Sequence, residues 1–164
     1  MYRLSEEKII LVTRPTRLTE LKKRFSTRSQ AKFYVSHLGQ DFSDYDREET
    51  EYTKSVQQAQ QALESLGRVQ LIDRSFLSNF SFGPNDLVVV LGQDGLVANT
   101  VKYLDGQPVI GVNPDPARWD GQLLPFQVGD VDKIVREVFQ GGRQRKSVTM
   151  AKATLNTGDR KSVV

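Results

Sequence analysis

The chain alternates short, uninterrupted apolar runs with longer stretches in which apolar residues recur every three or four positions. An apolar run between turn-forming residues is typical of a strand covered on both faces, and the longer spacing is typical of an amphipathic helix. We expect strands at residues 8–13, 69–72, 87–91 and 108–112. We expect helices at residues 18–25, 49–66, 96–103 and 131–139. This alternation predicts an α/β fold, a Rossmann-like open, mostly parallel sheet with helices on both faces.

Two stretches fit this alternation less well. Residues 26–48 mix Ser, Asp and a glycine with several aromatic residues. We interpret them as an insertion that packs on the sheet edge or takes part in dimer contacts. Residues 73–82 form a connection whose apolar side chains, including Phe76, are expected to lie in the core.

The composition is that of an ordinary globular domain. The 164 residues are 38% hydrophobic and 26% charged, with a net charge of +3. No apolar run approaches the roughly 20 residues that a membrane span requires, and the N-terminal residues have no secretory-signal pattern. Cysteine is absent, which excludes disulfides and thiolate metal sites and fits a cytoplasmic setting. Because the basic residues are scattered, we expect neither a nucleic-acid nor a membrane partner.

The bend after the run at 87–91 carries the clearest chemical signal. Gly92, Gln93, Asp94 and Gly95 follow the expected carboxyl end of a parallel strand, where ligands of such sheets bind. The glycines would let backbone amides approach a phosphate. The Asp94 carboxylate could act as a general base on a bound hydroxyl, or help to hold a metal on nucleotide phosphates. Alternatively, the glycines only form a strand-to-helix turn, and Asp94 is the N-cap of the helix.

Other candidate residues follow the neighbouring apolar runs. Asn113 comes directly after the run at 108–112, and Arg14 and Arg17 come after the run at 8–13. An arginine at the carboxyl end of a strand suits a nucleotide phosphate. The alternative for these two arginines is a solvated loop before a helix.

Two sequence blocks resemble the NAD kinase family. That family ends one strand in a Gly-Gly-Asp-Gly turn and the next in Gly-(Val/Ile)-Asn, which correspond here to Gly92-Gln93-Asp94-Gly95 and Gly111-Val112-Asn113. The following stretch, Asn113-Pro114-Asp115-Pro116-Ala117-Arg118 with Gly121-Gln122-Leu123 after it, is similar to the mitochondrial-type branch. The resemblance is strongest over residues 86–125.

The resemblance implies a phosphotransferase. A member of the family transfers the γ-phosphoryl group of ATP, or of polyphosphate, to the 2′-hydroxyl of NAD, with Mg²⁺ bound through the nucleotide phosphates. By resemblance, Asp94 would activate the hydroxyl, and the backbone of Gly92, Gln93 and Gly95 would hold phosphates. The loop that carries Asn113, Asp115 and Arg118 would border the substrate site. Small-molecule nucleotides are therefore the expected partners, and the intact protein is expected to be a homo-oligomer.

This sequence departs from the family pattern at two positions. Gln93 stands in place of the second glycine, at a cost of roughly 1 kcal/mol or more if that position requires a positive φ. Leu96 replaces the usual threonine. These departures leave two alternatives open, a non-catalytic nucleotide-binding relative and another kinase of the same superfamily, for lipids or sugars.

By the same resemblance, the chain divides into three parts. Residues 1–146 would form the α/β nucleotide-binding domain, and residues 147–157 would begin a truncated all-β second domain. No Asn-Glu or Asn-Asp pair, which grips NAD in the family's second domain, follows Asn156 here, so we expect this fragment to be inactive. Residues 159–164 can be encoded by a DNA string that resembles a sequencing adapter, and we expect residues 158–164 to be a non-native tail. The alternative is a genuine polar tail.

Overall fold

The structure is a computed structural model that describes residues 6–154 and 160–163. Its centre is a five-stranded, all-parallel sheet in the order β2-β1-β3-β4-β5. The strands are β1 (Lys8–Thr13), β2 (Arg68–Asp73), β3 (Leu87–Leu91), β4 (Val109–Asn113) and β5 (Phe126–Gln127). All five residues of β3 are buried, as expected for a strand whose sequence is apolar throughout. The four predicted strands are therefore confirmed, and only the two-residue β5 was not predicted.

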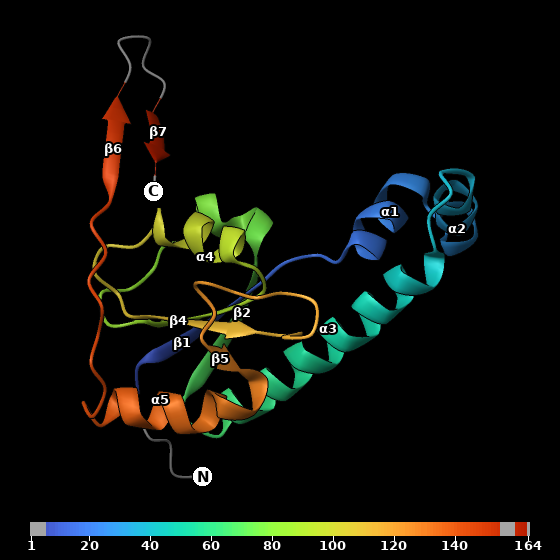
Figure 1. Ribbon diagram of the computed structural model, residues 1–164. Helices are drawn as coiled ribbons and strands as arrows, with labels where there is room; N and C mark the ends of the chain where they lie inside the picture. Colours follow the sequence, from blue (N-terminus) through green and yellow to red (C-terminus); the bar gives the residue numbers. More distant parts are fainter. Residues whose placement is uncertain (1–5, 155–159, 164) are drawn as a thin grey trace.

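Helices cover both faces of the sheet (Figure 1). On one face, α3 (Phe42–Glu64) and α5 (Val131–Phe139) pack their apolar stripes on alternate residues of β1 and β3. On the other face lie α4 (Asp94–Val101) and the 3₁₀ helix η1 (Arg74–Asn79). The predicted α/β, Rossmann-like arrangement is thus confirmed at the level of a parallel sheet flanked by helices.

The insertion at residues 26–48 is helical. It contains α2 (Arg28–His37) and the start of α3, which begins at Phe42 rather than near residue 49. Together with α1 (Arg17–Phe25) it forms what we call the helical lobe, residues 17–45, at the end of α3 that lies away from α5 (Figure 1). The lobe has its own small cluster of buried side chains, namely Leu18, Ala31, Val35 and Phe42. Packing of α2 on the sheet edge was therefore a wrong expectation, because α2 packs on α1 and α3 instead.

The core prediction for the connection between β2 and β3 holds with one exception. Leu77 is buried, and Phe80 and Phe82 pack against the same cluster. Phe76 is 62% exposed. In a 3₁₀ helix, residues three apart lie on one face, so Leu77 and Phe80 turn inward together and Phe76 turns outward.

The C-terminal residues form a separate hairpin. β6 (Ala151–Thr154) pairs antiparallel with β7 (Arg160–Val163), apart from the main sheet (Figure 1). Of residues 147–157, which are expected to begin an all-β domain, the structure describes 147–154, and the strand there begins at Ala151. Of the predicted non-native tail, residues 158, 159 and 164 lie outside the described residues.

Candidate functional site

The strand order creates an opening at one edge of the sheet. After β1 the chain passes to the face covered by α3, whereas after β3 it passes to the face covered by α4. At such a switch point, ligands bind outside the carboxyl ends of the strands. Arg14 follows β1, Gly92 follows β3 and Asn113 ends β4. The fold therefore brings the sequence-predicted residues to one edge of the sheet.

Asp94 lies at this edge as the first residue of α4, not in a turn before the helix. Gln93 is the N-cap, so the N-cap alternative for Asp94 is wrong. The two oxygens of the Asp94 carboxylate accept hydrogen bonds from the backbone amides of Leu123 at 2.8 Å and Gln122 at 3.0 Å. Asp94 therefore holds the loop that follows β4, and its negative charge suits the first turn of α4.

The glycine-flanked bend is free of backbone strain. Gln93 has a φ of −118°, so it lies in the extended region and avoids the cost that a positive φ would impose. A Cβ at Gly92 would lie 2.8 Å from the side chain of Leu96, which is buried beside it. A Cβ at Gly95 would have no neighbour within 4 Å among the described residues. Gly95 thus leaves space over the start of α4.

Asn113 organises the loop after β4, which we call the β4 loop (residues 114–125). Its side-chain amide donates to the Trp119 carbonyl at 2.8 Å, and its side-chain oxygen accepts from the Asp115 amide at 3.0 Å. The same loop crosses β4 so closely that a Cβ at Gly111 would lie 2.0 Å from the Leu123 carbonyl oxygen. Because Asp94 also binds this loop, the two sequence blocks that carry the resemblance are joined through it.

Arg14 is buried where β1 ends. Its guanidinium donates to Glu48 of α3 at 3.2 Å and to the Pro15 carbonyl at 3.3 Å. Its Nε has no hydrogen-bond partner among the described residues. The Arg14 Cδ would lie 3.6 Å from a Cβ at Gly92, so the side chain passes directly beside the bend.

Tyr52 of α3 joins the two strands that border the switch point. Its hydroxyl accepts from the Arg14 amide at 3.0 Å and donates to the Leu91 carbonyl at 2.7 Å. Burial raises the pKa of Tyr52 to about 12, against a smaller opposing effect of the Arg14 hydrogen bond. The helical spacing of apolar residues placed Tyr52 in the buried stripe of α3, but did not reveal this polar role.

Asp44, one helical turn before Glu48, collects three arginines. Its carboxylate accepts two hydrogen bonds from Arg118, at 2.6 and 3.1 Å, one from Arg17 at 2.7 Å and one from Arg47 at 3.0 Å. These bonds, with that of Arg118 the strongest, hold the pKa of Asp44 well below its usual range. Glu48 pairs with both Arg14 and Arg17. We call these residues the arginine cluster; they are Arg14, Arg17, Arg47, Arg118, Asp44 and Glu48.

The acidic members of the arginine cluster were missed from sequence. Glu48 fitted the acidic first turn of a helix, and Asp44 lay in the stretch without a pattern. The spacing of Asp44 and Glu48 at i and i+4 could have placed them on one helix face, but only if α3 had been extended to residue 42.

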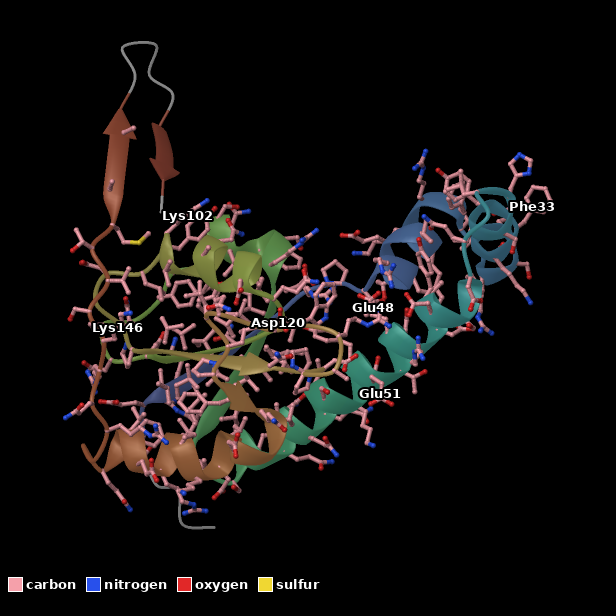
Figure 2. All side chains as sticks on the ribbon, in the orientation of Figure 1. Phe33, Glu48, Glu51, Lys102, Asp120 and Lys146 are labelled. Carbon is pink, nitrogen blue, oxygen red and sulfur yellow. The ribbon has the colours of Figure 1, made fainter. Side chains whose placement is uncertain are left out.

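A narrow pocket, open to solvent, lies between α3 and the β4 loop. Its lining includes Arg14, Glu48, Tyr52, Arg118 and Trp119. Figure 2 shows two of its acidic residues, Glu48 and Glu51, on α3, with Glu48 nearer to α1. A second hollow of about 460 Å³ lies beside it and reaches Asn113 and Gln127. Asp94 and Gly95 line neither hollow.

Within residues 6–154 and 160–163, no group of three or more His, Asp or Glu side chains gathers in a way that could hold a metal ion. In the same part of the chain, no helix has the length and apolar content to cross a membrane. The sequence matches no protein-family model, and no curated protein matches it.

Proposed function

We propose that this chain is the nucleotide-binding domain of an NAD kinase-like phosphotransferase. The supporting observation is that Asp94 and Asn113, one from each of the two resembling blocks, bind the same β4 loop at the carboxyl edge of a parallel sheet. ATP and NAD would bind at this edge, close to the switch point between β1 and β3.

Each predicted residue has a role in this proposal. The first amides of α4, at Asp94 and Gly95, would hold a nucleotide phosphate, because helix N-termini bind anions and Gly95 leaves room. Arg14 and Arg118 would meet phosphate oxygens from the side of the pocket. Asp94 would accept the proton of the attacking hydroxyl, because each of its oxygens keeps a second lone pair beside its bond to a β4 loop amide. Mg²⁺ held on the nucleotide phosphates would neutralise their charge.

One observation favours a second candidate, a nucleotide-binding protein without catalysis. Both oxygens of Asp94 already accept backbone hydrogen bonds, and this engagement gives the carboxylate a structural function that needs no chemistry. Leu96, where the family has threonine, is buried in the core beside Val97 and is therefore occupied by packing.

Calorimetric titration of the chain with NAD and with Mg-ATP tests the proposal. We expect both nucleotides to bind, and we expect Asp94→Asn to retain binding. Asp120→Asn is the matched control, because Asp120 is an exposed carboxylate of the same loop that makes no ion pair or hydrogen bond in the described structure. A chain that binds neither nucleotide contradicts both candidate functions.

NADP formation separates the two candidates. The assay is run on this chain and on any longer gene product that contains it. If either is a kinase, Asp94→Asn abolishes its NADP formation and Asp120→Asn preserves it. If both bind NAD and Mg-ATP but form no NADP, the non-catalytic candidate is supported.

A further inference from the structure

The arginine cluster connects three separate segments through one face of α3. Arg14 follows β1, Arg17 begins α1 and Arg118 lies in the β4 loop, yet all three bind Asp44 or Glu48. These two carboxylates are four residues apart and therefore share one face of the helix. No other carboxylate of the described chain binds more than one of these three arginines.

The cluster has more donors than the carboxylates satisfy. A guanidinium carries five N–H donors, and the Nε of Arg14 is buried without a partner among the described residues. An unpaired buried donor is costly, so this atom marks a place where an acceptor oxygen would be favourable. Arg14 and Arg118 line the same pocket, so one anion there could reach both side chains.

The two ion pairs differ in how readily an anion could replace them. The side chains of Arg14 and Glu48 are 8% and 4% exposed, and breaking a buried pair leaves an uncompensated buried charge. The side chains of Arg118 and Asp44 are 19% and 34% exposed, so water can hydrogen-bond to Asp44 after Arg118 has left it. Exchange is therefore expected at Asp44, while Glu48 stays on Arg14.

We propose that the Asp44 carboxylate competes with phosphate for Arg118. Asp44 binds Arg118 in the ligand-free chain, and the terminal phosphate of a polyphosphate bound in the pocket displaces Asp44 from Arg118. A phosphate carries more charge than a carboxylate and accepts bidentate hydrogen bonds from arginine. Arg14 lines the same pocket, and its Nε is a buried donor without a partner among the described residues.

The exchange would also affect the loop that binds Asp94. Arg118 belongs to the β4 loop, and the Gln122 and Leu123 amides of that loop occupy the Asp94 carboxylate. Release of Arg118 from Asp44 would remove one of the contacts that hold this loop to α3. This inference deepens the proposed function, because it regulates the same edge of the sheet, but its test uses an inorganic probe and requires neither NAD nor turnover.

The test is calorimetric titration of the full chain with inorganic tripolyphosphate. We expect Asp44→Asn to tighten binding by about fivefold to tenfold, and Arg118→Gln to weaken it by about tenfold. Glu51→Gln is the matched control, because Glu51 lines the same pocket from α3 but has no ion pair or hydrogen bond in the described structure. Removal of the Glu51 charge relieves repulsion of the anion but frees no arginine, so it should tighten binding by less than Asp44→Asn does. Equal effects of Asp44→Asn and Glu51→Gln, or weaker binding by Asp44→Asn, overturn the inference.

A measurement on the wild-type chain covers the case in which Asp44→Asn does not fold. In a carbon-detected NMR titration with tripolyphosphate, the Asp44 carboxyl resonance should move further than that of Glu51, because only Asp44 loses an arginine partner. Saturated binding with an unmoved Asp44 resonance contradicts the inference. The proposed function fails separately, if NAD and Mg-ATP do not bind while tripolyphosphate still displaces Asp44.

Discussion

At the scale of single residues, the Tyr52 hydroxyl links the ends of β1 and β3 on either side of the switch point. It accepts from the amide that follows β1 and donates to the last carbonyl of β3, and both partners are otherwise remote from α3 in sequence. Tyr52→Phe leaves the buried Arg14 amide and the Leu91 carbonyl without this partner. We expect a loss of about 1–3 kcal/mol in the free energy of unfolding, measured by denaturant titration. Tyr103→Phe, at a tyrosine that is 42% exposed, should change it by less than about 0.5 kcal/mol.

The same residue predicts how stability depends on alkaline pH. Burial raises the pKa of Tyr52 from 10.0 to about 12, so the folded chain binds this proton more tightly than the unfolded chain does. The resulting stabilisation is fully present below pH 10 and is lost as the pH rises toward 12. Tyr52→Phe should flatten this part of the stability profile relative to wild type. A wild-type profile that is already as flat as that of the variant contradicts the assignment.

At the scale of elements, the contact between β4 and the β4 loop depends on Gly111. An added Cβ would lie 2.0 Å from the Leu123 carbonyl oxygen, a backbone atom that can move only with the whole loop. We expect Gly111→Ala to lower the free energy of unfolding by about 3 kcal/mol or more. Gly95→Ala is the control, because a Cβ there meets open space at a helical position and should stabilise the chain by roughly 0.5–1 kcal/mol. Equal unfolding midpoints for the two variants contradict the close approach.

The apolar pattern of the sequence predicted the central strands but missed α2 and the first turns of α3. β1 and β3 were predictable because strands buried on both faces are apolar at every position. The first turns of α3 were not predictable, because their buried face includes Glu48, which binds arginines instead of packing on apolar side chains. Apolar periodicity therefore begins only where α3 reaches the sheet. The helix α2 was missed for a related reason, since only Ala31 and Val35 are buried along its length.

At the scale of the whole molecule, some residues of the candidate site were predictable from the sequence and others were not. Arg14, Asp94 and Asn113 were found because carboxyl ends of parallel strands meet at one edge, a rule that depends only on local order along the chain. Asp44 was not found, because its partners come from α1, α3 and the β4 loop and meet only after the chain has folded. The pairing of Asp94 with the amides of that loop was likewise invisible in the sequence.

The described residues bury three apolar clusters, two on the faces of the sheet and a much smaller one in the helical lobe, and this difference predicts unequal local stability. The sheet buries large apolar clusters on both faces, whereas the helical lobe is held by Leu18, Ala31, Val35 and Phe42 and by the ion pairs of the arginine cluster. Regions with few buried contacts open with lower free energies than the global unfolding. In native-state hydrogen exchange, we therefore expect the amides of α2 to exchange through a smaller opening, while those of β1 and β3 exchange only on global unfolding. α5 is the helical control, since its 9 residues nearly match the 10 of α2 but it packs on the sheet. Equal protection of α2 and α5 would show that the lobe and the sheet unfold as one unit.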